Sequence, residues 1–278
     1  MGLNAVLCVE HLTAVWSLTL RLGVNVQIEY LLAGPTQTLL IVEAANNGDQ
    51  HIAHDSLVVS GAGPLFNMEG EEGIGRRTWF EAQDNILGVT YEAQIEVNRQ
   101  LEPICELSAH PPNELSPEVA AYLFPSRYCE SDTFLDFVAD QFGHAYGGEQ
   151  IMEMAEWIFN NIQYTLGASV GTTTAADTFH HGQGVCRDFA HLMITFARAA
   201  GIPARMVSVY APRIEPPDFH AVVEIWLEGG WRLLDPTRMA SPTEMARIAV
   251  GRDAVDISFL TFFGSAELRQ QSVSAVVL

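Results

Sequence analysis

The sequence predicts an α+β protein, in which an N-terminal antiparallel β-sandwich is followed by helices packed on a second antiparallel sheet. Apolar and polar residues alternate with a period of two through much of residues 18–97, which is typical of half-buried strands. Prolines cluster over residues 102–117, and beyond them the apolar positions recur at helical spacing. Short runs of β-forming residues, separated by turn signals, follow a helix that is expected at residues 186–200.

The N-terminal strands are expected where apolar and β-branched residues dominate the sequence. In the last of them Val89, Tyr91 and Ala93 alternate with polar residues, so one face of that strand is apolar. The tripeptide Ala33-Gly34-Pro35 is a turn signal between the first two strands. Residues 1–16 fit this pattern poorly and could form an extension. The expected strands are 18–32, 37–43, 54–60, 75–81 and 87–97.

The second region begins with helices at residues 133–141 and 149–160, where apolar residues recur at helical spacing. In the second of these helices Ile151, Met154 and Ile158 share one face. We therefore expect three parts: a sandwich domain at 1–105, a linker with a leading helix at 106–148, and a core domain at 149–278.

The clearest helix runs over residues 186–200. Phe189, Met193 and Phe196 form one apolar stripe, and Gly201 supplies a C-terminal cap. Three strands are expected after it, at 204–210, 220–227 and 231–234. The last two form a hairpin, because a glycine-rich turn joins them.

The composition limits which partners the protein can have. The chain of 278 residues has 34 acidic residues against 14 basic ones, all of them arginine, and a formal net charge of -20. Such a charge repels nucleic-acid phosphates and anionic lipid heads, so neither nucleic acid nor a membrane is an expected partner. Without lysine, the chain offers no side-chain amine of its own to acyl-transfer chemistry. The sequence does not indicate an oligomeric state.

No apolar stretch reaches the roughly 18 to 20 residues that a membrane-spanning helix needs. The nearest, residues 3–20, is interrupted by Glu10 and His11. No basic stretch precedes it, as a secretory signal requires. A cytoplasmic location is therefore expected.

The cysteines and histidines do not form a pattern that binds metal. The four cysteines are Cys8, Cys105, Cys129 and Cys186. They are too few and too scattered for a disulfide framework or a zinc knuckle, so we expect one to be catalytic and the others to be small buried residues. Among the nearby histidines, His191 is five positions from Cys186 on the expected helix, and the two side chains point apart. We expect neither a metal nor a cofactor.

Cys186 stands where a glycine-bearing loop, Gly182-Gln183-Gly184, turns into the clearest helix. The unpaired N–H groups and the positive dipole end of a helix stabilise a thiolate, and can lower a thiol pKa below its free value of about 8.5. The same groups can receive a developing oxyanion, so the backbone N–H of Cys186 is a candidate donor. Tyr164, which precedes another glycine loop, is a second candidate donor and otherwise a packing residue.

A thiolate nucleophile needs a base, and His220 begins an expected strand. Asp235 closes the next strand, lies on the same sheet face by parity, and can hold the imidazole in one tautomer. A two-residue turn at Gly229-Gly230 would set Asp235 opposite Glu224, about four residues from His220. We therefore expect a wider turn near Leu227-Glu228, or a bulge, which brings His220 and Asp235 level.

Several motifs follow one another in the core region. They are Gly184-Val185-Cys186-Arg187-Asp188-Phe189-Ala190-His191, Ala199-Ala200-Gly201-Ile202-Pro203-Ala204-Arg205, His220-Ala221-Val222-Val223-Glu224, Asp235-Pro236-Thr237 and Arg247-Ile248-Ala249-Val250-Gly251-Arg252-Asp253. Together they resemble the transglutaminase-like superfamily, in its bacterial cysteine-peptidase-like branch. The resemblance covers residues 150–260 well and the sandwich of 18–100 loosely. Two positions depart from it, since related sequences often carry an aromatic residue at Val222 and an asparagine at Arg238.

The resemblance implies a papain-like catalytic core with a triad of Cys186, His220 and Asp235. It also implies thiol acyl chemistry on amides: a cysteine peptidase or amidase that hydrolyses a peptide or protein amide through a thioester. Two alternatives remain open. One is a transamidase that transfers the acyl group to an external amine, and the other is a non-enzymatic binding module that keeps the fold.

Overall fold

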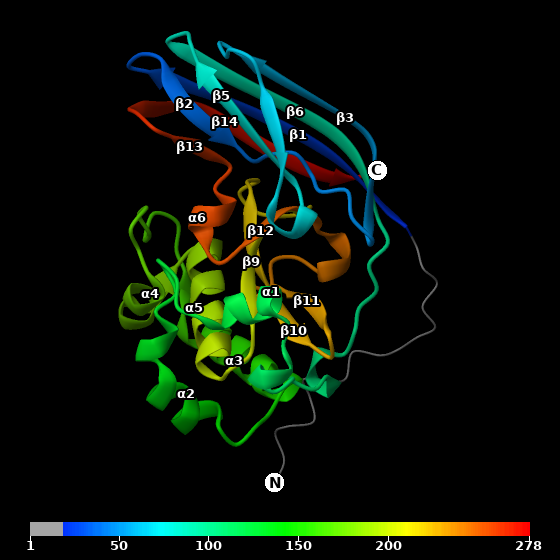
Figure 1. The fold of residues 1–278 in the computed structure, drawn as a ribbon, viewed down its shortest axis with the longest axis vertical. Coiled ribbons are helices and arrows are strands. Elements are labelled where there is room, and N and C mark those ends of the chain that lie inside the picture. Colours follow the sequence, from blue (N-terminus) through cyan, green and yellow to red (C-terminus); the bar gives the residue numbers. More distant parts are fainter. Residues whose placement is uncertain (1–18) are drawn as a thin grey trace.

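A computed structural model describes residues 19–278. Strands from residues 20–97, together with two strands from the C-terminal end of the chain, form two four-stranded antiparallel sheets (Figure 1). One sheet has the strand order β14-β1-β6-β3 and the other β13-β2-β5-β4. The expected extension at residues 1–16 lies outside the described residues. The strands are β1 (Leu20–Leu32), β2 (Thr36–Leu40), β3 (Gln50–Ser60), β4 (Phe66–Glu69), β5 (Arg76–Ala82), β6 (Ile86–Val97), β13 (Leu260–Phe262) and β14 (Ala266–Val277).

Alternation of apolar residues places one face of β1 and one face of β6 in the core of the sandwich. On β1, Leu22, Val24 and Val26 are buried, and on β6 the buried set includes Val89 and Tyr91. These two strands pair along their whole length. The five expected strands of this region are all present, and the fold class predicted from the period-2 pattern is confirmed.

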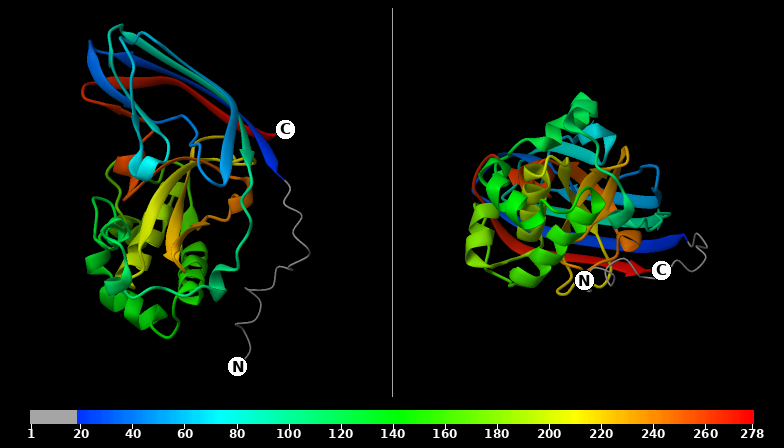
Figure 2. Two further views of the ribbon diagram at one scale, coloured as in Figure 1. Left: turned by 45° about the vertical axis from the view of Figure 1, so that its right-hand side comes forward. Right: turned by 90° about the horizontal axis from the view of Figure 1, so that it is seen from below.

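The end of the chain returns to the sandwich. Strand β14 pairs with β1 from Ala266 opposite Leu32 to Val277 opposite Leu22, and β13 pairs with β2 (Figures 1 and 2). The range 149–278, expected as one core domain, therefore includes two strands that hydrogen-bond to the N-terminal sheets. Much of β14 is exposed and lacks a clean apolar alternation, so the sequence gives little sign of its partner.

The core domain packs helices on a sheet of order β11-β10-β9-β12. Its helices are α1 (Pro117–Ala120), α2 (Leu135–Phe142), α3 (Gly148–Asn161), α4 (Ala175–His181), α5 (Cys186–Ala199) and α6 (Ala254–Ile257). Its strands are β7 (Gln163–Tyr164), β8 (Gln183–Gly184), β9 (Ala204–Tyr210), β10 (His220–Leu227), β11 (Gly230–Leu234) and β12 (Ala246–Gly251). Single 3-10 turns are η1 (Glu71–Gly73), η2 (Ile104–Glu106), η3 (Pro112–Glu114), η4 (Ala121–Leu123), η5 (Ser131–Thr133) and η6 (Pro242–Glu244).

Helix α5 is the buried axis of this domain. Every residue from Asp188 to Arg198 is buried, and the stripe that includes Met193 and Phe196 is fully so. Phe196 contacts an aromatic cluster that includes Phe137 and Trp157, at centroid distances of 5.3 and 5.6 Å. Because close packing holds α5 on all sides, the position of its first residue is fixed.

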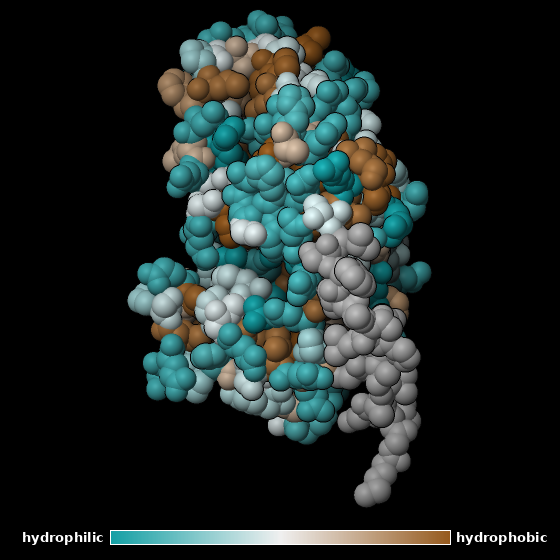
Figure 3. Space-filling model, turned by 90° about the vertical axis from the view of Figure 1, so that its right-hand side faces the viewer, coloured by the Kyte–Doolittle hydropathy of each residue, from teal (hydrophilic) through white to brown (hydrophobic). Residues whose placement is uncertain are grey.

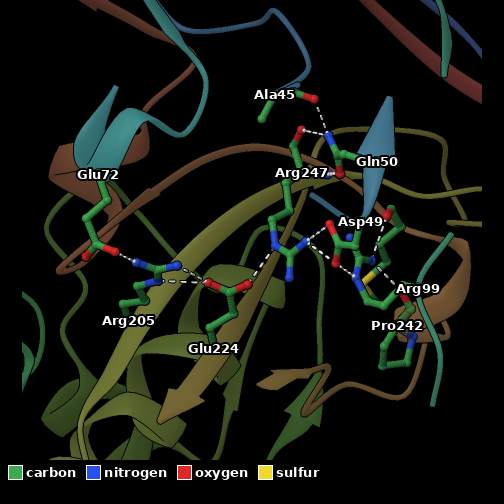
Figure 4. Close-up of polar contacts among 10 residues, drawn as sticks. Ala45, Asp49, Gln50, Glu72, Arg99, Arg205, Glu224, Pro242 and Arg247 are labelled. Atoms are coloured by element: carbon green, nitrogen blue, oxygen red, sulfur yellow. Dashed lines mark hydrogen bonds and ion pairs between the residues drawn. The ribbon is translucent and has the colours of Figure 1, made fainter. Parts of the chain in front are cut away.

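A buried chain of alternating charges joins the sandwich to the core sheet (Figure 4). Glu224 on β10 pairs with Arg205 on β9 at 2.7 Å and with Arg247 on β12 at 2.6 Å. Arg205 in turn reaches Glu72 of η1, and Arg247 reaches Asp49 ahead of β3, each at 2.7 Å. Breaking one of these ion pairs would leave a buried charge without a partner, which is costly. The series of ion pairs therefore holds the sandwich against β10, the strand that begins with His220.

The outer surface matches the acidic composition. Hydrophilic side chains cover much of the face shown in Figure 3, with hydrophobic patches mainly over the sandwich. Within residues 19–278, no helix is long and apolar enough to cross a membrane.

Candidate active site

Cys186 is the first residue of α5, as the sequence predicts. The carboxylate of Asp188, which is fully buried, accepts hydrogen bonds from the Val185 N–H at 2.8 Å and from the Ser169 hydroxyl at 2.9 Å. A side chain at Gly184 would place its Cβ 2.6 Å from the Cβ of Asp188, so only glycine fits there. These contacts lock the turn that presents the thiol at the helix N-terminus, where the dipole favours a negative charge.

His220 and Asp235 form a buried pair. His220 opens β10 and Asp235 directly follows β11, and each is at most 5% exposed. The imidazole Nε2 lies 2.9 Å from Oδ2 of Asp235. The same carboxylate accepts hydrogen bonds from the backbone N–H and the hydroxyl of Thr237, at 2.9 and 2.7 Å, and from the backbone N–H of Ala240 at 3.1 Å.

The predicted wider turn of the β10–β11 hairpin is wrong. Leu227 pairs with Gly230, so the loop has only two residues, Glu228 and Gly229, and both have positive φ. Extending the ladder would set Asp235 beside Val222, two positions from His220. The pair still forms, because long side chains reach diagonal neighbours on the same sheet face, and because β11 has already ended at Leu234.

The imidazole of His220 also interacts with Cys186, and the two residues line one cavity. Burial by itself would lower the pKa of His220, but hydrogen bonds and charge interactions with Asp235 and Cys186 outweigh it and raise that pKa to about 10. Nε2 is occupied by Asp235, whereas the buried Nδ1 has no hydrogen-bond partner among the described residues and is the ring nitrogen left for a proton from the thiol. Burial would also raise the pKa of Asp235, but His220 and Thr237 hold it below its ordinary value.

Tyr164 lies on β7, next to the segment that leads into α5. It pairs with Gly184 in the short parallel ladder of β7 and β8, two residues before Cys186. Burial and the nearby charge of Cys186 raise the pKa of Tyr164 to about 12. Tyr164 is therefore near Cys186, although it is not among the residues that line the cavity at Cys186 and His220.

A cavity of about 520 Å³ opens over these residues. Cys186 and His220 line it together with Asp218, and the sandwich side contributes Ile41 and Gln271. The remaining lining is largely apolar, which suits a substrate that buries part of its surface.

His191, which was considered as a metal ligand, is instead a buried residue that packs and forms a hydrogen bond inside the core domain. Its Nε2 accepts a hydrogen bond from the Ala254 N–H at 3.2 Å, and its ring stacks on Tyr128 at a centroid distance of 4.9 Å. Burial lowers the pKa of His191 to about 3. Across the described part of the chain, no three His, Cys, Asp or Glu side chains are grouped to hold a metal ion.

Two residues of the cavity were not among the sequence candidates. Asp218 lies two positions before His220, in a proline-containing loop, and this closeness in sequence to His220 is the signal that points to it. Gln271 lies on β14, and only the return of the chain to the sandwich brings it to the cavity.

Comparison with known proteins identifies relatives for this arrangement. Residues 137–236 match the sequence model of a family described as "Transglutaminase-like superfamily". A solved structure from Cytophaga hutchinsonii, described as a "Putative Cysteine Protease", is 32% identical and matches with a TM-score of 0.89. That match covers 94% of this chain and 92% of the Cytophaga chain, so it includes the sandwich as well as the core.

Two curated relatives share a smaller part. An uncharacterized protein of Mycobacterium leprae is 32% identical over 117 residues, which cover 39% of this chain and 42% of the relative. An uncharacterized protein of Mycobacterium tuberculosis is 29% identical over 124 residues, covering 39% and 40%. The matched part thus spans about two fifths of these mycobacterial proteins.

Proposed function

Because the chain belongs to the transglutaminase-like superfamily, we propose that it is a thiol-dependent amide hydrolase, a cysteine peptidase or amidase acting on a peptide or protein amide. One observation carries the proposal. Cys186, at the N-terminus of α5, lies against the imidazole of His220, whose far nitrogen is 2.9 Å from the carboxylate of Asp235. A nucleophile, a base and a group that orients the base are the parts that covalent amide hydrolysis needs.

In the proposed acylation, the thiolate of Cys186 attacks the carbonyl carbon of the amide and a carbon–sulfur bond forms. The backbone N–H of Cys186 and the hydroxyl of Tyr164 donate hydrogen bonds to the oxyanion. The imidazolium of His220 then gives its proton to the amine nitrogen as the carbon–nitrogen bond breaks. The amine leaves, and the acyl group stays on sulfur as a thioester.

In the proposed deacylation, His220 takes a proton from water while the water oxygen attacks the thioester carbonyl. The carbon–sulfur bond breaks, the carboxylic acid leaves, and the thiolate–imidazolium pair is restored. Asp235 keeps one ring orientation through both steps and stabilises the imidazolium that acylation consumes and deacylation restores. An external amine in place of water would give transfer instead of hydrolysis.

Peptide cleavage followed by mass spectrometry tests the proposal. We expect new carboxyl termini from a mixed peptide library, and a trapped acyl-enzyme whose mass maps to Cys186. The Cys186→Ala protein should form neither, whereas Cys129→Ala, which changes a buried cysteine of the core, should still form both. Absence of cleavage by the folded wild-type protein on any peptide would contradict the proposal. Addition of methylamine separates the alternatives, since a transamidase would yield methylamides in place of free carboxylates.

A further inference from the structure

The cavity over the thiol contains one acidic side chain that the proposed mechanism does not use. Asp218 lines the cavity with Gln271, while Arg127 and Arg187 also line it. The guanidinium of Arg187 donates to the hydroxyl of Ser169 at 2.6 Å, so it is held by neighbours of α5. The two arginines and Asp218 are therefore separate charges, with no ion pair between them in the described chain.

Asp218 is held in one orientation from two sides. Its Oδ1 accepts hydrogen bonds from the backbone N–H of Phe219 at 2.7 Å and from the side-chain amide of Gln271 at 2.6 Å. The ring of Phe219 stacks on Phe259 at a centroid distance of 4.7 Å, which fixes the loop. Gln271 lies on β14, so the sandwich positions a side chain of the cavity.

The other carboxylate oxygen of Asp218 is available. Within residues 19–278, Oδ2 accepts no hydrogen bond and no arginine forms an ion pair with the group. Burial raises the pKa of Asp218. The Asp218 side chain is exposed at the cavity, so Oδ2 can accept a charge-assisted hydrogen bond from a cationic group of a ligand.

Asp218 is also close to the reacting group. It lines the same cavity as Cys186 and His220. Along the chain, Asp218 precedes His220 by two residues. A ligand group that pairs with Asp218 would therefore belong to the part of the substrate next to the scissile amide.

We propose that Asp218, oriented by Gln271, is a specificity-determining residue that binds an ammonium or guanidinium group of the amide substrate. The proposal rests on the function proposed above and names its substrate class: amides with a cationic group near the bond that is broken. A charge-assisted hydrogen bond at this carboxylate should improve binding of such a substrate by about five- to tenfold over a neutral one.

Three bromoacetamides with tails of equal length test the proposal without a known substrate. The tails end in an ammonium, a methyl group or a carboxylate, and each reagent alkylates the thiol by the same displacement of bromide. The concentration dependence of Cys186 alkylation gives an inhibition constant KI for each reagent. In the wild-type protein, we expect KI to be lowest for the ammonium reagent, by about five- to tenfold against the methyl reagent, and highest for the carboxylate reagent.

Variants identify the residue responsible. Asp218→Asn should bring the KI ratio of the ammonium and methyl reagents to about one, and Gln271→Ala should lower that ratio in part. The matched control is Asp140→Asn, which removes an exposed carboxylate of α2 that does not line the cavity and should keep the full ratio. The control distinguishes the effect of the Asp218 carboxylate on KI from the general attraction of a cationic reagent to an acidic protein.

Equal KI values for the ammonium and methyl reagents in the wild-type protein would overturn the proposal, while alkylation of Cys186 would leave the proposed function standing. A preference that survives in a folded Asp218→Asn protein would overturn it too. Where Asp218→Asn does not fold, Gln271→Ala decides, and a full KI ratio in that folded variant would overturn the proposal. Failure of all three reagents to label Cys186 in the folded protein would remove both proposals together.

Discussion

His220 and Asp235 share a buried hydrogen bond of 2.9 Å across the open end of the β10–β11 hairpin. The carboxylate has three further hydrogen bonds from Thr237 and Ala240, so its position does not depend on the histidine. A fixed acceptor on Nε2 selects the tautomer and the rotation of the ring, and leaves the unpartnered Nδ1 for proton exchange with the thiol of Cys186. The mechanism proposed for this site depends on that arrangement.

Replacement of Asp235 by asparagine should lower kcat/KM by about 10²- to 10⁴-fold, because the imidazolium loses its counter-charge and its tautomer is no longer fixed. Steady-state kinetics on a cleaved peptide measures this. Thr237→Val is the matched comparison, since it removes one hydrogen bond to Asp235 and keeps the charge. Its loss should be much smaller, and equal losses for the two variants would contradict the role given to the charge.

The Tyr164→Phe variant should lower kcat by about 10- to 10³-fold with little change in KM, because an oxyanion donor acts mainly in the transition state. The measurement is the separate determination of kcat and KM on one peptide. Retention of full kcat would show that the backbone N–H of Cys186 suffices and that Tyr164 serves packing alone.

The folded protein should lose stability as pH rises through the range in which His220 titrates. The pKa of His220 is raised from 6.5 to about 10, so the folded state keeps a proton that the unfolded chain has released. This contribution is complete below pH 6.5 and disappears as the pH rises to about 10. Chemical denaturation at several pH values measures the effect, as the difference between wild type and His220→Gln. A difference that stays constant or grows over this range would contradict the raised pKa.

Glu224→Gln should lower the free energy of unfolding by about 3–5 kcal/mol, because it leaves the buried guanidinium groups of Arg205 and Arg247 without their shared counter-ion. Glu244→Gln is the control. It breaks the pair with Arg213, whose side chain is 69% exposed, and should cost less than about 1 kcal/mol. Equal costs in denaturant titrations would show that the buried chain of charges does not hold the sandwich to the core.

Local pattern was enough to predict most of the elements that carry the site. The apolar stripe of α5 and the glycine cap after it identified the helix, and therefore the placement of Cys186 at its start. Parity along β10 and β11 placed His220 and Asp235 on one face. These features are set by residues close in sequence, where periodicity and turn chemistry act directly.

Features that depend on distant residues were not predictable in the same way. The pairing of β14 with β1 joins segments more than 200 residues apart. Strand β14 is mostly exposed, so its sequence has no apolar alternation that would predict this pairing. Gln271 reaches Asp218 only through that pairing. The β10–β11 turn was predicted to be wider than it is: it has two residues, Glu228 and Gly229, and the non-glycine residue Glu228 has a positive φ.

The central claim is an activated thiol at Cys186. It is tested most directly by the rates of iodoacetamide alkylation at Cys186 and Cys129, the free cysteines of the described residues, from pH 4 to 9, mapped by peptide mass. Cys129 is an internal reference, since burial raises its pKa to about 12. We predict that Cys186 reacts rapidly already at pH 5 to 6, that Cys129 does not, and that His220→Ala abolishes the early reaction. A Cys186 that reacts only above about pH 8, or not at all in the folded protein, would contradict the account and favour a binding module that keeps the fold.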